Sequence, residues 1–112
     1  MFKIVIFGSG HHAKVIFSEI IKIKKFRFLG FVDDFKNKGE LIVSLNKKKF
    51  YNLGSIKEVI NKKNNFKGII GVGLNFVREK IVYDINKIDN NFKFQKIISN
   101  DATINSNVVI DE

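Results

Sequence analysis

The sequence contains no cysteine, proline or tryptophan, and it has only two histidines. The absence of cysteine excludes disulfides and cysteine-bound metal sites. The two histidines, His11 and His12, are adjacent, and neighbouring side chains on a helix point about 100° apart, so they make a poor chelating pair. We therefore expect no metal site.

Long apolar runs are also missing. No stretch reaches the ~18 apolar residues that a membrane span needs. Only four apolar residues separate Lys3 from Gly8, which is too short for the apolar region of a signal peptide. We therefore expect a cytoplasmic protein without a membrane span.

Arginine is scarce although the chain is strongly basic. The net charge is +9, with 18 lysines against 2 arginines, and the lysines are scattered over every segment. Arginine is the preferred reader of phosphates and bases in nucleic acids, so we do not expect nucleic-acid binding. A solvated lysine surface is the simpler interpretation, and it would still favour an anionic ligand.

The pattern of apolar residues predicts alternating strands and helices in a single domain. Short apolar runs typical of strands lie at residues 2–7, 28–32, 41–45, 67–72 and 92–98. Apolar residues at helical spacing predict helices over residues 12–24, 56–63 and 75–88, and Ser55 and Glu58 predict a capping box at the start of the second. Residues 47–51 are interpreted as a loop. This order predicts an α/β fold, a small Rossmann-like and mostly parallel sheet with flanking helices.

The first predicted strand runs into a glycine turn that opens the first predicted helix. Gly8-x-Gly10-x-x-Ala13 has the spacing of a dinucleotide-binding fingerprint. Such glycines allow close approach of a phosphate, and the helix start adds free N–H groups. Asp33 follows 20 residues after Ala13, where such folds bind a ribose hydroxyl. A tight turn that binds no ligand is the alternative.

Further polar residues are expected at the same edge of the sheet. Gly73-x-Asn75-x-x-Arg78 follows another predicted strand, and the carboxyl ends of parallel strands share one edge. Asn75 can cap the next helix, and Arg78 either reaches a phosphate or is solvated. His11 and His12 either hydrogen-bond a ligand or remain solvated.

Asp33 and Asp34 are adjacent at a predicted strand end. Their side chains are expected to point to opposite sides, which suits binding of hydroxyls or a base edge better than shared acid–base catalysis. Nothing in the sequence resembles a nucleophile–base triad, so no catalytic residue is predicted.

The C-terminal residues follow a six-residue period. Ile98, Ile104 and Ile110 are six apart, and Ala102 and Val108 each follow four residues after an isoleucine of this set. This spacing is typical of a left-handed parallel β-helix, although three isoleucines can also coincide in an isoleucine-rich chain. The prediction is a domain over residues 1–98 and the first hexads of a β-helix over residues 99–112.

Four segments, in the right order, resemble the family of sialic-acid O-acetyltransferases (NeuD) and bacillosamine-pathway N-acetyltransferases (PglD). Residues 7–15 are similar to its Gly-x-Gly-Gly-His-Ala-Lys-Val opening, and residues 30–34 to its Gly-Phe-Leu-Asp-Asp. Residues 71–78 resemble its Ile-Gly-Asp-Asn-x-x-Arg segment, and residues 96–104 resemble the entry into its hexapeptide β-helix. The chain departs from the family at His11, which replaces a glycine, and at Ser99-Asn100, which replace His-Pro.

The resemblance implies a Rossmann-like domain that binds a UDP-sugar or related sugar in surface-glycan biosynthesis. It also implies a trimeric β-helix that binds acetyl-CoA as co-substrate and supplies the catalytic histidine. Carried over to this sequence, the substrate-binding residues are Gly8, Ser9, Gly10, His11, His12, Asp33, Asp34, Gly73, Asn75 and Arg78.

The resemblance implies that the catalytic base lies beyond residue 112. We therefore expect this chain to bind the substrate without catalysing the reaction. It implies no cofactor bound by the chain itself, and a monomer or weak oligomer. The alternative function is an NAD-type dinucleotide-binding or sensing module, and a third is a structural remnant without a ligand.

Overall fold

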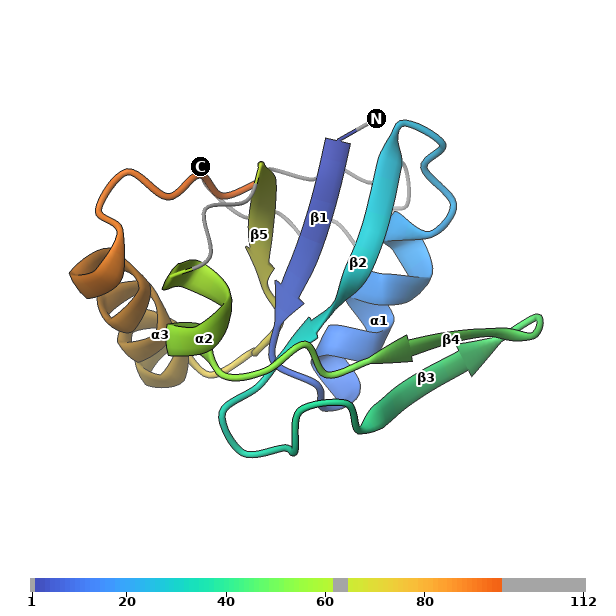
Figure 1. The fold of residues 1–112 in the computed structure, drawn as a ribbon, viewed down its shortest axis with the longest axis horizontal. Helices are drawn as coiled ribbons and strands as arrows, with labels where there is room; N and C mark the ends of the chain where they lie inside the picture. The colour runs from blue at the N-terminus through green and yellow to red at the C-terminus, as the bar shows by residue number, and fades with distance from the viewer. Residues whose placement is uncertain (1, 62–64, 96–112) are drawn as a thin grey trace.

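A parallel sheet forms the centre of the computed structural model, which describes residues 2–61 and 65–95 (Figure 1). Within these residues the sheet has three strands in the order β2–β1–β5, with β1 (Phe2–Phe7) between β2 (Phe26–Val32) and β5 (Phe66–Ile70). Both pairings of β1 are parallel. The predicted Rossmann-like sheet is therefore confirmed.

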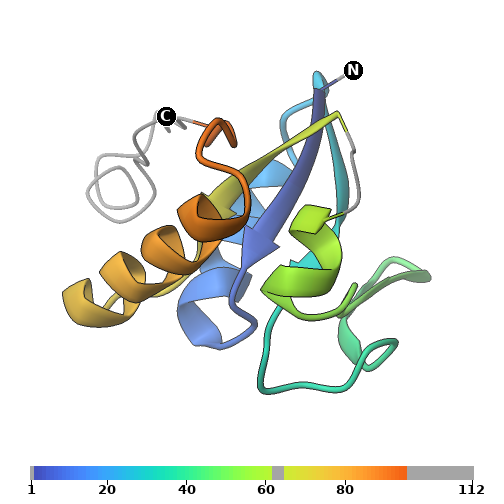
Figure 2. The same ribbon diagram turned by 60° about the vertical axis from the view of Figure 1, so that its left-hand side comes forward.

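The helices cover both faces of this sheet (Figure 2). Helix α1 (His11–Ile20) lies on one face, and α2 (Ile56–Asn61) and α3 (Asn75–Ile88) lie together on the other. Right-handed crossovers produce this placement, because α1 connects β1 to a strand on one side of it and α2 leads to a strand on the other side.

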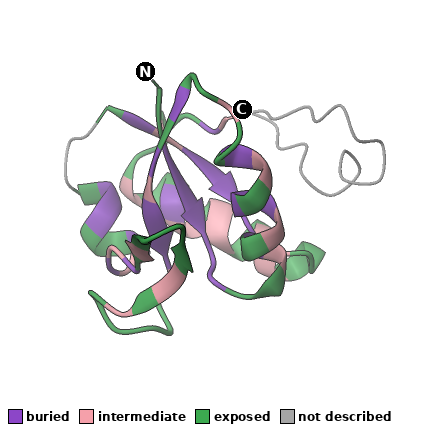
Figure 3. Ribbon diagram, turned by 90° about the vertical axis from the view of Figure 1, so that its right-hand side faces the viewer, coloured by how far each residue is buried: buried purple, intermediate pink, exposed green. Residues whose placement is uncertain are grey.

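The core lies between the sheet and the helices (Figure 3). Residues 4–7 of β1 are fully buried, as expected for a central strand covered on both faces. Two groups of phenylalanine rings extend this core. Phe17 of α1 contacts Phe28 and Phe31 of β2, whereas Phe7 contacts Phe92 and Phe94 near the C-terminal end of the described chain.

The predicted loop at residues 47–51 is wrong, because most of it forms a strand. β3 (Leu41–Leu45) and β4 (Lys48–Tyr51) pair as an antiparallel hairpin that is separate from the main sheet. The turn residues Asn46 and Lys47 have φ angles of 50° and 68°, as in a type I′ turn. Phe50 packs the hairpin against the core through contacts with Phe17 and Phe28. The local sequence, which is rich in lysine, does not indicate these long-range contacts.

Other element boundaries also differ from the prediction. α1 ends at Ile20 and β2 begins at Phe26, because the chain turns between them through hydrogen bonds from Ile23 N to Ile20 O (2.9 Å) and from Phe26 N to Ile23 O (3.1 Å). Ile23 is still partly buried against the core, which explains its helix-like spacing.

The last predicted strand, residues 92–98, is reduced within the described residues to one bridge between Phe94 and Gly68. Residues 62–63 of the second predicted helix, residues 96–98 and the whole six-residue repeat lie outside the described part of the chain.

Candidate functional site

A cavity of about 360 Å³ lies at the carboxyl ends of β1 and β2 and beside α3. The loop after each of these strands contributes to its wall, as does Val72 after β5 and Ile56 at the start of α2. Its full lining comprises Gly8, Ser9, Gly10, Val32, Asp33, Asp34, Phe35, Ile56, Val72, Phe76, Val77, Lys80, Ile81 and Asp84. Ligands in open α/β sheets bind at this edge, so the cavity is the candidate site.

The glycine turn forms one end of the cavity. Gly8 has a φ of +110°, and a Cβ there would lie 3.0 Å from the Gly71 carbonyl oxygen. Gly10 precedes α1 and makes no side-chain capping bond, and a Cβ on it would meet nothing within 4 Å. The first N–H groups of α1 therefore have no cap from Gly10 and can serve an anion.

The small third position of the glycine motif has a packing role. A Cβ on Gly71, just after β5, would lie 2.9 Å from the Ala13 Cβ and 2.6 Å from Ile6 Cγ2. Ala13 is fully buried. A side chain larger than alanine at position 13 would push α1 away from the sheet, so Ala13 keeps the start of α1 close to the strand ends.

Asp33 connects the glycine turn to the end of β2. Its Oδ2 accepts a hydrogen bond from Ser9 Oγ (2.5 Å), and its Oδ1 accepts one from Phe35 N (2.9 Å). Ser9 is buried, with 5% of its surface exposed. Each carboxylate oxygen has a second lone pair, so Asp33 can hold its own loop and still accept a hydrogen bond from a ligand hydroxyl.

Asp34 binds the start of α2, which forms another part of the cavity wall. Its Oδ1 accepts a hydrogen bond from Ile56 N (2.7 Å) at the start of α2. The predicted capping box is confirmed in the same turn, because Ser55 N donates to Glu58 Oε1 (3.0 Å) and Glu58 N donates to Ser55 Oγ (3.1 Å). Asp33 and Asp34 thus line one cavity while binding different backbone groups.

Asn52 is a residue of this site that sequence reasoning missed. Only 1% of its surface is exposed. Its Oδ1 accepts from Asp33 N (2.9 Å), and its Nδ2 lies 3.1 Å from Asp33 O, 3.0 Å from Lys36 O and 3.2 Å from Asn37 O. Asn52 therefore fixes the loop after β2. No local pattern marks it, because its partners lie 15 to 19 residues earlier.

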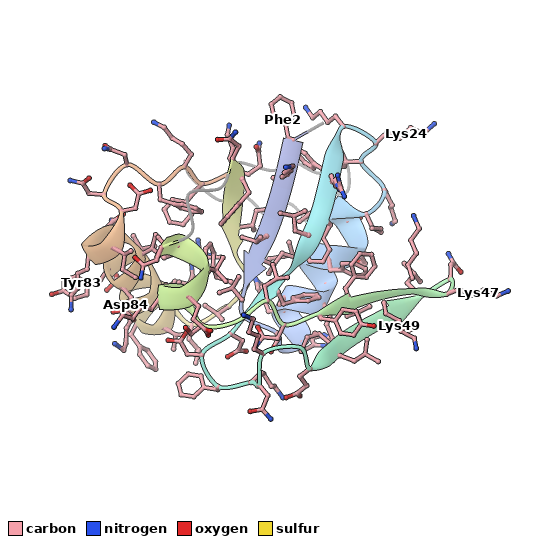
Figure 4. The ribbon with its side chains drawn as sticks, viewed as in Figure 1. Phe2, Lys24, Lys47, Lys49, Tyr83 and Asp84 are labelled. Carbon is pink, nitrogen blue, oxygen red and sulfur yellow. The ribbon has the colours of Figure 1, made fainter. Side chains whose placement is uncertain are left out.

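Helix α3 forms the far wall of the cavity. Phe76, Val77 and Ile81 line the cavity, and Phe76 is 70% exposed. Lys80 and Asp84, which form an ion pair of 3.4 Å, line it as well. Asp84 is labelled on α3 in Figure 4. The i, i+4 spacing of Lys80 and Asp84 is the only sequence signal that places these two side chains on one face of the helix.

The sequence-predicted site residues divide into two groups. Gly8, Ser9, Gly10, Asp33 and Asp34 line the cavity, whereas His11, His12, Gly73, Asn75 and Arg78 are not part of its lining. Of the second group, His12 and Gly73 are neighbours, since a Cβ on Gly73 would lie 3.7 Å from His12 Nδ1.

Asn75 is exposed and is the first residue of α3, so it does not cap the helix as expected; the N-cap is Leu74. Arg78, one turn further along α3, is half-buried.

The charge of the cavity is opposite to that of the whole chain. Three carboxylates line it (Asp33, Asp34 and Asp84) against one ammonium group, Lys80. Among residues 2–61 and 65–95, no three histidine or acidic side chains lie close enough together to hold a metal ion. No helix in this part of the chain has the length and apolar character needed to cross a membrane.

Known proteins with a similar sequence or fold agree with this architecture. The model of the PglD N-terminal domain family matches residues 3–85. The solved acetyltransferase domain of PglB from Neisseria gonorrhoeae FA1090 superposes with a TM-score of 0.66 at 22% identity, over 90% of this chain and 46% of that one. A second structure of that domain, in complex with acetyl coenzyme A, gives a TM-score of 0.60 at 24% identity, over 88% and 44%.

These likenesses show a shared fold, and this chain spans less than half the length of the two PglB structures. No curated protein matches the sequence. The family model covers the described chain from β1 into α3, including the glycine turn and Asp33. The chain therefore belongs to the PglD N-terminal domain family.

Proposed function

We propose that this chain binds the nucleotide-sugar substrate of an acetyl-CoA-dependent sugar acyltransferase that acts in bacterial surface-glycan biosynthesis in the cytoplasm. Residues 1–98 would be the substrate-binding domain, and residues 99–112 would begin a left-handed β-helix. The complex of the PglB domain with acetyl coenzyme A supports acetyl-CoA as co-substrate. Its site, the catalytic base and the trimer contacts would belong to the β-helix domain.

One observation carries this proposal. Gly8, Gly10, Asp33 and Asp34, which lie on two loops of the chain, line the same cavity at the strand ends. The glycine turn and the start of α1 present N–H groups to a diphosphate. The carboxylates of Asp33 and Asp34 would repel phosphate and accept hydrogen bonds from ribose or sugar hydroxyls. The volume of about 360 Å³ lies in the range of small-molecule sites.

A dinucleotide such as NAD is the second candidate, since the same turn and Asp33 suit its pyrophosphate and ribose. A ligand that binds only the folded state raises its stability by RT ln(1 + [L]/Kd). Thermal unfolding with UDP, a UDP-amino sugar, a CMP-sugar and NAD ranks the candidates. We expect UDP or a nucleotide sugar to give the largest shift. A shift with NAD alone would reverse the order, and no shift with any of the four would favour a structural remnant.

Two glycine variants test the location of the site. Gly10→Ala adds a methyl group where no atom lies within 4 Å, so the fold accepts it, but the methyl group occupies the space in which a phosphate would approach. We expect a penalty of about 1–3 kcal/mol in binding, as for other small-to-large changes in a packed site.

Gly73→Ala is the matched control, because its Cβ meets only His12 at 3.7 Å and Gly73 lies outside the cavity lining. Titration calorimetry with UDP should separate the two variants. Equal loss of affinity in both would show that the ligand does not occupy this cavity.

A further inference from the structure

We propose that Phe35 and Phe76 form an aromatic clamp that binds the nucleobase of the ligand. The inference rests on the proposed function and adds the element that selects a nucleotide over a plain sugar phosphate. Both rings line the cavity, Phe35 from the loop after β2 and Phe76 from the first turn of α3. Both are also among the most exposed apolar side chains of the described residues.

Phe35 is exposed although its backbone is held in place. Its side chain is 96% exposed, while its N–H donates to Asp33 Oδ1 (2.9 Å). Asn52 binds the carbonyl oxygens of Asp33 and Lys36, on both sides of Phe35. An anchored loop that presents an uncovered ring is prepared for a contact, because the entropy of ordering the loop is already lost before the ligand binds.

Phe76 approaches from the opposite wall. It is 70% exposed and is held by helix α3, whose N-terminal turn is closed by a hydrogen bond from Arg78 N to Leu74 O (3.0 Å). The lining beside it is apolar at Val77 and Ile81 and polar at Asp84. Two exposed rings at an apolar cavity suit a planar group that can stack on them.

A nucleobase is the planar group that this cavity fits. The glycine turn and the start of α1 form the end of the cavity suited to phosphates, and the two phenylalanines belong to the same cavity. The carboxylates of Asp33 and Asp34 can accept hydrogen bonds from ribose hydroxyls and base N–H groups. One nucleoside diphosphate could therefore meet all three parts of the lining.

Leucine substitutions test the clamp without disturbing the core. Phe35→Leu and Phe76→Leu remove an exposed ring, so we expect an unchanged free energy of unfolding and an affinity for UDP about tenfold weaker in each case, since stacking on one ring is lost. Tyr83→Leu is the matched control, because Tyr83 is 62% exposed on α3, the helix that also carries Phe76 (Figure 4), and it lies outside the cavity lining. Ribose 5-phosphate, which has no base, should bind the wild type and both phenylalanine variants equally.

A fluorescent variant provides a direct reading, because the chain has no tryptophan. Phe35→Trp keeps an aromatic ring in the clamp, and its emission should be quenched by UDP in a saturable way but not by ribose 5-phosphate. Tyr83→Trp should respond to neither.

If UDP stabilises the wild type but leaves the Phe35→Trp emission unchanged, the clamp is wrong and the proposed site remains. A Phe35→Trp emission typical of a buried ring before ligand is added would show that protein covers this position, and would also overturn the clamp. If UDP and the nucleotide sugars fail to stabilise the wild type, both proposals fall.

Discussion

At the scale of single residues, the candidate site depends on side chains that serve the fold and the cavity together. Asp33 accepts hydrogen bonds from Ser9 and Phe35, and its backbone N–H donates to Asn52. The bonds with Ser9 and Asn52 join the loop after β2 to other parts of the site, and the bond with Phe35 holds the loop itself. The acid at the strand end was predictable from its distance to the glycine turn, whereas the buried amide that supports it was not.

Replacing Asn52 by alanine should destabilise the whole loop. The change removes the amide that binds Asp33 N and the carbonyl oxygens of Lys36 and Asn37. Asp33 N still donates to Gly54 O (3.2 Å) and Asn37 O still accepts from Glu40 N (3.0 Å), so the main loss is at Lys36 O, and an unsatisfied group costs about 1–3 kcal/mol. We expect a loss of about 1–3 kcal/mol in the free energy of unfolding, measured by urea denaturation. Asn86→Ala, on the exposed side of α3, should stay within about 0.5 kcal/mol of the wild type. Similar losses of stability in the two variants would show that Asn52 does not hold the loop after β2.

At the scale of elements, sequence period predicted the central strand, the helix over residues 75–88 and the capping box of α2, but it missed the second strand of the hairpin. Lys48–Tyr51 is mostly exposed, and it is a strand because it pairs with β3 across a two-residue turn and because Phe50 reaches the core. Pairing of this kind depends on a partner strand and leaves little trace in local composition.

In the hairpin turn, the same substitution by glycine is expected to change the free energy of unfolding in opposite directions at two neighbouring positions. Lys47, at the free end of the hairpin (Figure 4), has a φ of 68°, which a residue with a Cβ adopts at a cost of about 1 kcal/mol. Lys47→Gly creates the Asn-Gly pair that type I′ turns prefer, so we expect an increase of about 0.5–1 kcal/mol in the free energy of unfolding. Lys48→Gly places glycine at the first residue of β4, where it pairs with Leu45, and should lower the free energy of unfolding by about 0.5 kcal/mol. Both effects are measurable by urea denaturation, and a loss with Lys47→Gly would mean that the turn has another geometry.

At the scale of the whole molecule, the charge of the candidate site differs from that of the chain as a whole. The chain has a net charge of +9, yet three carboxylates and one lysine line the cavity. The basic surface can attract an anionic ligand over a distance, while the cavity itself accepts groups that donate hydrogen bonds. This division agrees with a ligand that carries both phosphates and hydroxyls.

The proposed arrangement of domains predicts the assembly state of this chain. Two hexads cannot stack into a β-helix core, because a solenoid needs at least about three repeats. We therefore expect residues 1–112 to sediment as a monomer of 12.9 kDa. Analytical ultracentrifugation measures this directly. A stable trimer of the chain alone would show that the trimer contacts lie within these residues and not in a following β-helix.

The sequence by itself determined the strand–turn–helix unit around Gly8 and Gly10, the acid at Asp33 and the capping box at Ser55. Each of these depends on residue type and spacing within one element or its immediate neighbours. The tertiary structure decided which residues line the cavity. The rotation of α3 about its axis directs Phe76 and Lys80, and not Asn75 and Arg78, into the cavity. That rotation is fixed by packing against distant elements, as is the position of Asn52 behind Asp33, and local spacing does not specify either.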